Sequence, residues 1–343
     1  MEFVRDVTLA PYTTLGIGGP ALWFAEAATE DDIAAGVAFS HEHALPLFIL
    51  GGGSNLLVSD SGFPGLVLHI ALRGIEQTNE SGPFSVAAGE PWDGFVSVTV
   101  AKRWAGLECL SGIPGTVGGT PVQNVGAYGQ EVSQTITAVR AFDRKTEQFV
   151  TLENAQCGFA YRRSVFNSTA RERYIVSRVD YSLVKNGEPA LAYEDLKRHF
   201  GDRSPTLSEL RSAVLAIRER KGMLIVPGQG DSLSAGSFFK NPVVPLAALE
   251  RIANVLATES KSIPRYPAGN GAVKVPAAWL LEQAGFPKGY VLGNAGISSR
   301  HTLALINRGG AKAADMIALR NKIVEAVEKR FGIHLEPEPV WVS

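Results

Sequence analysis

The sequence predicts an α+β fold with about two domains, since 343 residues exceed the usual size of one domain. Two observations support this fold class. Strand-like runs are spread over the chain before residue 205, whereas helix-like segments become frequent after it. The strands and helices do not alternate regularly, as a doubly wound parallel sheet would require. With 45% hydrophobic and 20% charged residues, the composition is that of an ordinary globular protein.

Four segments before residue 205 have the pattern of strands. Residues 44–50 form a short apolar run that ends in glycines, which is typical of a buried strand leading into a loop. Residues 65–70 repeat this character. Residues 136–152 contain two strand-like runs around the polar stretch 143–146, so we predict a hairpin there. A fourth strand is predicted at 174–183.

The helices after residue 205 are predicted from their capping and stop signals. Thr206 and Glu209 form a capping box, and an apolar helical stripe follows until Gly222, which suggests a domain boundary near Lys221. Further helices are predicted at about 245–257, 276–284 and 313–331, the last two stopped by Gly285 and Gly332. The tail from 333 to 342 contains two prolines and is therefore an edge strand or an irregular segment.

Charge and cysteine content exclude several classes of function. The 33 basic and 34 acidic residues leave a net charge of −1, so neither a nucleic-acid groove nor a polybasic membrane patch is expected. No apolar run approaches the roughly 20 residues of a membrane span. The acidic start of the chain lacks the basic region of a signal peptide, so we expect a cytoplasmic protein. Cys109 and Cys157 have no metal-ligand spacing and are expected to be buried free thiols.

Three glycine-rich segments are candidates for binding a dinucleotide. Gly51, Gly52 and Gly53 directly follow a predicted strand, where bare backbone N–H groups can approach a diphosphate. Residues 111–119 and 123–129 offer two more such surfaces. Taken alone, each segment is more simply a tight turn, but together they favour a cofactor site. Residues 16–21 formally fit a dinucleotide fingerprint, but no strand precedes them and Pro20 falls in the expected first helical turn. They are therefore either a plain turn or a loop of small residues that contacts a ligand.

Three further segments carry groups suited to acid–base chemistry. Arg162 stands beside hydroxyl-bearing residues and can bind a carboxylate with two hydrogen bonds, although an exposed loop arginine is the simpler interpretation. Ser237 is followed by two aromatic residues and Lys240, and it is either a proton donor or a turn serine. Glu338 lies between two prolines that restrict its backbone, and the alternative is a solvated surface acid.

In this order, the six segments resemble the UDP-N-acetylenolpyruvoylglucosamine reductases, also called UDP-N-acetylmuramate dehydrogenases. The resemblance covers nearly the whole chain. It implies a vanillyl-alcohol-oxidase-type FAD-binding fold in two subdomains, at 1–70 and 71–221, followed by an α+β substrate-binding domain at 222–332. The C-terminal segment 333–343 would carry Glu338 back to the FAD-binding part. The implied reaction reduces the enolpyruvyl ether of UDP-N-acetylglucosamine with FAD and NADPH in peptidoglycan precursor synthesis.

The resemblance also implies roles for individual residues. Arg162 would stabilise the negative charge that develops on the substrate, Glu338 would polarise its carboxylate, and Ser237 would donate the proton, with Lys240 or a water assisting. The implied FAD-binding residues are Gly51, Gly52, Gly53, Ser54, Asn55, Ser111, Gly112, Ile113, Pro114, Gly115, Thr116, Gly118, Gln123, Asn124, Gly126, Ala127 and Tyr128. The implied substrate-binding residues are Tyr161, Tyr193, Lys221, Asn241 and His301.

Tyr193, in an apparent loop, resembles the tyrosine that closes over substrate in the loop-bearing subgroup of this family. Two departures concern the cofactor loops: Asn167 stands where the family often has lysine, and Gly118-Gly119-Thr120 replaces a run of alanines. Two other readings stay open at this point, a flavin oxidase of the same fold and a non-catalytic nucleotide-sugar sensor. In each case the expected partner is a small molecule, with no metal, nucleic acid or membrane, and the protein is expected to be a monomer.

Overall fold

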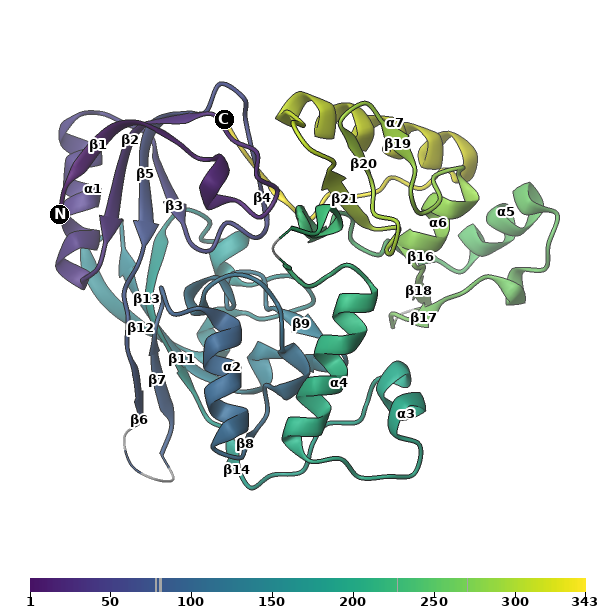
Figure 1. The fold of residues 1–343 in the computed structure, drawn as a ribbon, viewed down its shortest axis with the longest axis horizontal. Coiled ribbons are helices and arrows are strands. Elements are labelled where there is room, and N and C mark those ends of the chain that lie inside the picture. The colour runs from purple at the N-terminus through teal and green to yellow at the C-terminus, as the bar shows by residue number, and fades with distance from the viewer. Residues whose placement is uncertain (78, 80–81, 227, 270) are drawn as a thin grey trace. The chain divides into compact units, whose positions relative to one another are not determined.

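The computed structural model describes residues 1–77, 79, 82–226, 228–269 and 271–343. The chain divides into two compact units, and Figure 1 shows the elements of each. The first unit contains residues 1–7, 20–53 and 63–219, and the second contains 8–19, 54–62 and 220–343. Helices and strands occur in both, as expected for an α+β protein. Within the described residues, no helix is both long and apolar enough to cross a membrane.

The first unit contains a four-stranded sheet in the order β1-β2-β5-β3. Its strands are β1 (Phe3–Thr8), β2 (Pro20–Ala27), β3 (Leu47–Leu50) and β5 (Phe63–Ile70). β5 runs parallel to both β2 and β3. Helix α1 (Glu30–Glu42) connects β2 to β3 and begins at a capping box between Thr29 and Asp32. The sequence reading found no regular βαβ alternation, yet this part of the chain contains one such crossover.

The second sheet of this unit has five strands in the order β12-β11-β13-β7-β6, all antiparallel. They are β6 (Ile75–Gln77), β7 (Phe84–Ala87), β11 (Ile136–Asp143), β12 (Gln148–Glu153) and β13 (Tyr174–Tyr181). The predicted hairpin at 136–152 is confirmed, with Asp143 opposite Gln148. The predicted strands at 44–50, 65–70 and 174–183 are confirmed as β3, β5 and β13, with shifted ends.

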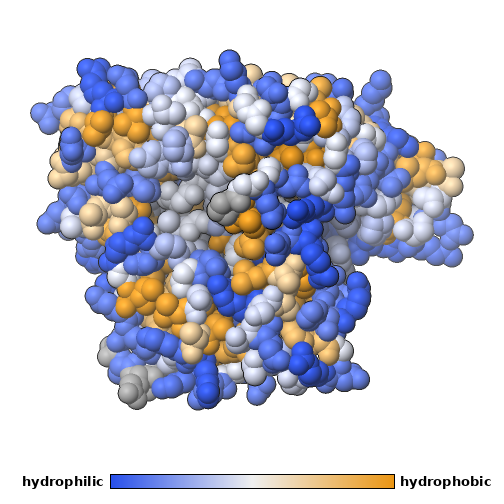
Figure 2. Space-filling model, viewed as in Figure 1, coloured by the Kyte–Doolittle hydropathy of each residue, from blue (hydrophilic) through white to orange (hydrophobic). Residues whose placement is uncertain are grey.

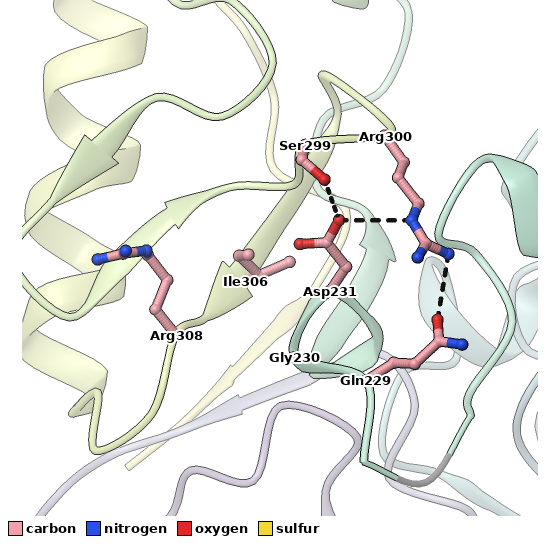
Figure 3. A pocket seen from close by; sticks show the side chains of 7 residues that line it. All are labelled: Gln229, Gly230, Asp231, Ser299, Arg300, Ile306 and Arg308. Atoms are coloured by element: carbon pink, nitrogen blue, oxygen red, sulfur yellow. Dashed lines mark hydrogen bonds and ion pairs between the residues drawn. The ribbon is translucent and has the colours of Figure 1, made fainter.

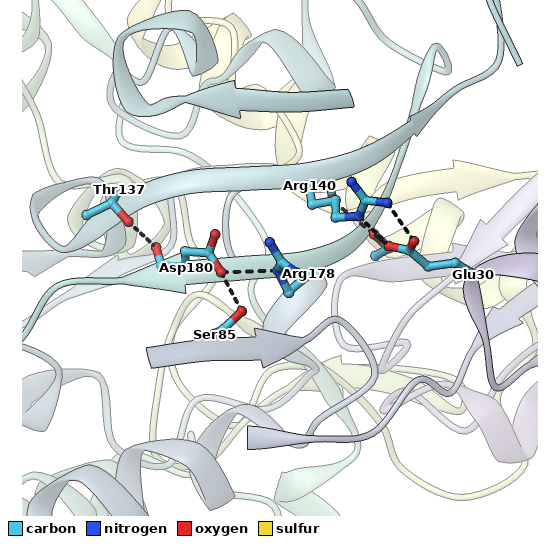
Figure 4. Close-up of polar contacts among 7 residues, drawn as sticks. Glu30, Ser85, Thr137, Arg140, Arg178 and Asp180 are labelled. Atoms are coloured by element: carbon cyan, nitrogen blue, oxygen red, sulfur yellow. Dashed lines mark hydrogen bonds and ion pairs between the residues drawn. The ribbon is translucent and has the colours of Figure 1, made fainter. Parts of the chain in front are cut away.

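Glu30, in the first turn of α1, ties this helix to the five-stranded sheet (Figure 4). Its carboxylate accepts hydrogen bonds from Arg140 Nε at 2.7 Å and Nη2 at 2.9 Å, and from Ser177 Oγ at 2.7 Å. The bond from Arg140 is the main reason why the pKa of Glu30 is lowered. Figure 4 also shows Asp180, which accepts a bond from Ser85 Oγ at 2.7 Å. Such two-point arginine contacts fix the orientation of a helix against a sheet.

The first unit has three more helices, α2 (Trp92–Ala101), α3 (Glu194–Phe200) and α4 (Leu207–Arg220). Only α4 was predicted, from its capping box. The apolar sides of α3 and α4 pack together around Cys109, which is fully buried. Short two-residue strands complete the unit: β8 (Trp104–Ala105) pairs with β14 (Val184–Lys185), and β9 (Gly126–Ala127) pairs with β10 (Gln130–Glu131).

Among its described residues, the second unit contains three small sheets and the α-helices α5 (Ala247–Leu256), α6 (Ala277–Gln283) and α7 (Ala313–Phe331). One sheet has the order β15-β21-β20-β19, with β15 (Ser234–Ser237), β19 (Val291–Leu292), β20 (Ala295–Ile297) and β21 (Ala304–Asn307). Another contains β16 (Val243–Pro245), β17 (Tyr266–Pro267) and β18 (Ala272–Lys274). The predicted helices are confirmed as α5, α6 and α7.

The C-terminal segment forms a strand in this same unit. β22 (Val340–Val342) pairs in parallel with β4 (Leu56–Val58). Both parts of the expectation for residues 333–342 are therefore seen, because 340–342 form a strand whereas 333–339 are irregular apart from an isolated bridge at Pro337. Asp60, two residues after β4, accepts hydrogen bonds from the backbone N–H groups of Ala313 and Ala314 and so caps the start of α7. The domain boundaries drawn from the sequence stay a prediction.

The exposed side chains are of mixed character. Figure 2 shows hydrophilic residues interspersed with apolar ones over the face it presents. Large apolar side chains that are well exposed include Val184, Val243, Leu246 and Tyr266. Scattered apolar residues of this kind are normal on a protein surface and identify no site by themselves.

Candidate active site

The first two glycine loops of the predicted cofactor site lie against each other within the first unit. A Cβ atom on Gly52 would lie 2.5 Å from Gly115 Cα, and one on Gly51 would lie 3.0 Å from Thr116 Oγ1. Gly115 has a φ of +122°, a conformation that residues with side chains rarely adopt. Only glycine therefore allows this approach. The two loops therefore pack backbone against backbone, and a side chain at Gly52 would push them apart.

The loop at 111–119 is fixed by the start of α2. Trp92 donates its backbone N–H to Gly115 O and its indole Nε1–H to Leu110 O, both at 3.0 Å. The N–H of Gly112 donates to Asp93 Oδ1 at 2.5 Å. Gly118 donates to Ala88 O at 2.8 Å. The N–H groups of Gly112 and Gly118 thus hold the loop in its conformation.

Asp93 connects this loop to α4, although no motif in the sequence indicated a role for Asp93. Its carboxylate accepts hydrogen bonds from Arg211 Nη1 at 2.6 Å and Nη2 at 2.7 Å. Burial opposes ionisation of Asp93, but the hydrogen bonds from Arg211 and Gly112 outweigh it and lower its pKa. The signal in the sequence was a single acid in the first turn of an otherwise apolar segment.

The third loop, at 123–129, is joined to the segment that carries Arg162. Asn124 is buried, accepts from the N–H of Ser133 at 3.1 Å and donates to Ala160 O at 3.1 Å. Arg162 Nη2 donates to Gly126 O at 2.9 Å. One predicted FAD-binding residue therefore orients the guanidinium of the predicted catalytic arginine.

Arg162 lies at the tip of a tight turn with a φ of +55°. Ala160 and Arg163 exchange backbone hydrogen bonds across this turn. The side chain of Asn167 donates to Arg162 O at 3.1 Å and accepts from the N–H of Ser164 at 2.9 Å. Asn167, noted in the sequence only as a departure from the family pattern, thus stabilises the strained turn.

The two predicted tyrosines of the first unit are both partly exposed. The ring of Tyr161 lies 5.4 Å from the Arg162 guanidinium. Tyr193 is the N-cap residue of α3, so it stands where the expected loop meets a helix. Its ring packs edge-on against Tyr128, with centroids 5.2 Å apart.

In the second unit, the structure brings Ser237 and Glu338 to one place. Ser237 ends β15 and lies opposite Ala304 of β21. The next residue, Phe238, donates its N–H to Leu303 O at 2.8 Å and accepts the N–H of Glu338 at 2.9 Å. Phe238 is only 1% exposed, so this backbone junction is rigidly packed.

Asn55, a predicted FAD-binding residue, holds the segment of Glu338. Its side-chain amide donates to Glu338 O at 3.2 Å, and its own carbonyl accepts from the N–H of Val340 at 2.9 Å. The preceding residue, Ser54, uses its carbonyl oxygen to accept a bond from Thr14 at 3.4 Å. Asn55 therefore holds the C-terminal side of the predicted catalytic acid, and Phe238 holds its N-terminal side.

The other predicted residues of this unit lie in several different elements. Lys240 forms an ion pair with Glu336, and its N–H donates to Glu336 O at 3.0 Å. Asn241 Oδ1 accepts from the N–H of Ala277 and caps α6. His301 Nδ1 accepts from the N–H of Leu303 at 3.0 Å. Lys221 directly follows α4, ahead of Gly222 with its φ of +63°.

A cavity of about 370 Å³ opens in the second unit (Figure 3). Figure 3 shows the Asp231 carboxylate between Ser299 and Arg300; Ser299 Oγ donates to it at 2.6 Å. Arg300 Nη1 also donates to Gln229 Oε1 at 3.1 Å. Its lining residues are Gln229, Gly230, Asp231, Ser299, Arg300, Ile306 and Arg308, and none of them is a predicted site residue.

Both cysteines are buried and reduced. Burial raises the pKa of Cys109 to about 12 and that of Cys157 to about 11, so both thiols are neutral at pH 7. A search of the described ranges found no group of three or more His, Cys, Asp or Glu residues arranged to hold a metal ion.

Comparisons with known proteins complete this description. Residues 21–152 match the model of an FAD binding domain, and residues 229–342 match that of the UDP-N-acetylenolpyruvoylglucosamine reductase C-terminal domain. The chain is 46% identical to the UDP-N-acetylenolpyruvoylglucosamine reductase of Thermobifida fusca, over 100% of this chain and 98% of that one. It is 46% identical to that of Streptomyces coelicolor, over 100% and 91%. The crystal structure of the reductase from Thermus caldophilus matches over 100% and 98%, with 26% identity and a TM-score of 0.67.

Proposed function

The chain belongs to the UDP-N-acetylenolpyruvoylglucosamine reductase family, and from this premise we propose how its residues carry out the reaction. It is an FAD-dependent oxidoreductase with the vanillyl-alcohol-oxidase-type fold. With NADPH as reductant, it reduces the enolpyruvyl ether of UDP-N-acetylglucosamine to UDP-N-acetylmuramate for peptidoglycan synthesis. The flavin oxidase alternative is not favoured, because the match to this family includes the C-terminal domain.

The observation that carries the assignment of catalytic residues is the junction at Phe238. Its backbone joins the strand that ends in Ser237 to the segment that presents Glu338. When bound and reduced by NADPH, FAD would supply the hydride for the vinyl methylene carbon of the substrate. Negative charge then develops on the neighbouring carbon and its carboxylate, and the chain has to stabilise this charge and deliver a proton.

For the cofactor, we propose that the loops at 51–55, 111–118 and 123–128 hold FAD. The contact between Gly52 and Gly115 supports this proposal because it holds two glycine-rich loops together, and glycine backbone allows the close approach that a diphosphate needs. Gly112 and Gly118 would act indirectly, since their N–H groups bond to Asp93 and Ala88 and hold the loop.

We propose that Arg162 stabilises the charge on the substrate carboxylate. Its guanidinium has five N–H donors in a rigid fork that suits a carboxylate. The bond to Gly126 O orients this fork, and the bond from Asn167 to Arg162 O holds the turn behind it. The guanidinium of Arg162 is therefore held in a fixed orientation, as electrostatic catalysis requires.

We propose that Ser237 donates the proton to the carbon next to the carboxylate. A serine hydroxyl is a weak acid, so it needs a partner that replaces its proton. Lys240 is a less suitable partner than the sequence suggested, because its ammonium group pairs with Glu336. An ordered water is the better candidate for this role.

Glu338 is proposed to polarise the substrate carboxylate. Two carboxylates in contact repel each other unless one is protonated or a cation balances them. Its backbone is held on both sides, by Phe238 through its N–H and by Asn55 through its carbonyl. The residue is partly exposed, and its backbone position is fixed by these two bonds.

The remaining assignments concern substrate binding, cellular location, oligomeric state and partners. Tyr193 is proposed to close over the substrate, with Tyr161, Lys221, Asn241 and His301 binding other parts of the nucleotide sugar. Asn241 would do so with its amide NH₂, because its oxygen caps α6. We also propose that the protein is a cytoplasmic monomer that binds neither nucleic acid nor membranes, in keeping with its net charge of −1.

A pair of acids in one segment tests the role of Glu338. Glu338→Gln is expected to slow the reduction of the substrate by about 10- to 100-fold. Glu336→Gln, at an exposed position two residues earlier, is the matched control and should stay within about twofold of the wild type. Consumption of NADPH under saturating substrate measures both. Equal activity of the two variants would remove Glu338 from the catalytic set.

A further inference from the structure

A buried carboxylate, Glu108, lies outside the residues assigned to the reaction. It follows α2 in an otherwise apolar stretch and is only 1% exposed. Such a group needs several donors around it, because an uncompensated buried charge is costly. Its Oε2 accepts the N–H of Gly106 at 2.7 Å. Its Oε1 accepts the side-chain NH₂ of Gln130 at 2.8 Å and the N–H of Ala190 at 3.0 Å.

These bonds connect two segments that are distant in the chain. Gln130 ends the third cofactor loop, and its side-chain oxygen accepts the N–H of Cys109 at 2.8 Å. Ala190 lies three residues before Tyr193, and its carbonyl accepts the thiol of Cys109 at 3.3 Å. Both backbone polar groups of Ala190 are thereby bound to the same short element.

Two more contacts join these two segments, and a third supports Tyr128 from α4. A Cβ on Gly129 would lie 2.9 Å from Ala192 Cβ, so the backbones pack closely there. Tyr128 packs edge-on against Tyr193. Arg218 of α4 is buried, with 7% of its surface exposed. Its guanidinium donates a hydrogen bond to the Tyr128 hydroxyl.

We propose that Glu108 is a positioning residue for Tyr193. It fixes the segment 189–193 on the cofactor loop, so that the ring of Tyr193 is held against Tyr128 before substrate arrives. The inference rests on the proposed role of Tyr193 in substrate binding. Its consequence is that the position of Tyr193 and the conformation of the cofactor loop depend on each other.

Ala190→Pro tests this inference without removing the buried carboxylate. The substitution removes the N–H that Glu108 accepts and leaves the bonds of Glu108 to Gly106 and Gln130 in place. Glu188→Pro, at an exposed position of the same segment, is the matched control. Glu108→Ala is the second variant and should give the same pattern; if it does not fold, Ala190→Pro decides alone.

The first readout is amide hydrogen exchange of the FAD-loaded protein without substrate. The N–H groups of Leu196 and Lys197 both donate to Tyr193 O at 3.0 Å and report whether this turn is held. We expect exchange about 10-fold faster in Ala190→Pro and unchanged in Glu188→Pro. Unchanged exchange in Ala190→Pro would overturn the proposal.

The second readout is a double-mutant cycle with Tyr193→Phe. Ala190→Pro should raise the KM for the nucleotide sugar about 5- to 10-fold with kcat within about twofold, and adding it to Tyr193→Phe should cause no further rise. Additive effects would show that Glu108 does not act through Tyr193 and would overturn the proposal. If Tyr193→Phe alone leaves KM unchanged while exchange rises in Ala190→Pro, the positioning by Glu108 stands and the substrate role of Tyr193 falls.

Discussion

Phe238 accepts the backbone N–H of Glu338 at 2.9 Å, and this bond helps to join two parts of the second unit that are far apart in the chain. Because Phe238 follows Ser237 directly, the proposed proton donor and the proposed carboxylate-polarising acid stand on one rigid support. Asn55 holds the same segment from the other side of Glu338. Pre-positioned groups of this kind are what stabilisation of a developing charge requires.

Gly52 and Gly119 form a pair of substitutions that tests the cofactor loops. In Gly52→Ala the added methyl would lie 2.5 Å from Gly115 Cα, so the loops have to separate. We expect FAD affinity to fall at least about 10-fold, since the diphosphate surface is disturbed. In Gly119→Ala the methyl meets nothing within 4 Å. The flavin content after purification measures the effect of each substitution. Equal flavin loss in the two variants would show that the contact between Gly52 and Gly115 does not support FAD binding.

Arg211 tests whether the clamp on Asp93 supports cofactor binding. Arg211→Met removes both hydrogen bonds to Asp93, whose Oδ1 also accepts the N–H of Gly112. Losing this partly buried pair is expected to weaken FAD binding about 3- to 10-fold. Arg203→Met breaks an exposed ion pair with Glu209 near the start of α4 and serves as the control. Titration of the apoprotein with FAD would refute the link if both variants bound equally well.

Arg162→Lys separates the charge of this residue from its shape. A lysine keeps the positive charge but lacks the fork of donors, so it cannot reproduce both the bond to Gly126 and a two-point contact with a carboxylate. We expect kcat/KM for the nucleotide sugar to fall about 10²-fold. Arg163→Lys, at the neighbouring exposed position, should remain near the wild type. Full activity of Arg162→Lys would show that charge alone suffices.

Asp143 gives a prediction on stability and pH. Hydrogen bonds from Arg173 at 2.9 and 2.7 Å lower its pKa to about 2, below the usual value of about 3.8. The carboxylate therefore stabilises the folded state above about pH 4, and this contribution is lost as the pH falls towards 2. Asp143→Asn should cost about 1 kcal/mol of unfolding free energy at pH 7 and almost nothing near pH 2.

Denaturant unfolding between pH 7 and pH 2 measures this difference. Asp202→Asn, an exposed aspartate in the same unit, is the control and should lower stability little at any pH. A deficit in Asp143→Asn that stays constant down to pH 2 would contradict an ionised, arginine-bound Asp143.

The elements that the sequence predicted well are those with strong local signals. Helix α7 begins and ends where its apolar stripe and Gly332 place it, because a glycine with positive φ stops a helix locally. Helix α1 escaped prediction because its buried side consists of Ile33, Gly36, Val37 and Ser40, which form only a weak apolar stripe. Helix α2 is apolar nearly throughout and so lacks a clear helical period.

The sequence suggested individual site residues, but it did not predict the backbone pairing and hydrogen bonds that connect them. The resemblance named Ser237 and Glu338, yet their proximity depends on strand pairing and on the return of the C-terminal segment, which no local pattern encodes. Three further residues hold loops of the proposed site in place but belong to no recognised catalytic or binding motif: Asp93, Glu108 and Asn167. A charged residue in an apolar stretch, as at Glu108, was the one available signal, because such a residue requires partners supplied by the fold.

The most direct test of the central claim follows the flavin absorbance band anaerobically in the wild type and in Ser237→Ala. NADPH is added first and the enolpyruvyl nucleotide sugar second. We predict that NADPH bleaches the band at the same rate in both proteins, and that the nucleotide sugar restores it about 10² to 10⁴ times more slowly in Ser237→Ala. Recovery at the wild-type rate, or an equal loss in both half-reactions, would contradict the proposed proton transfer from Ser237.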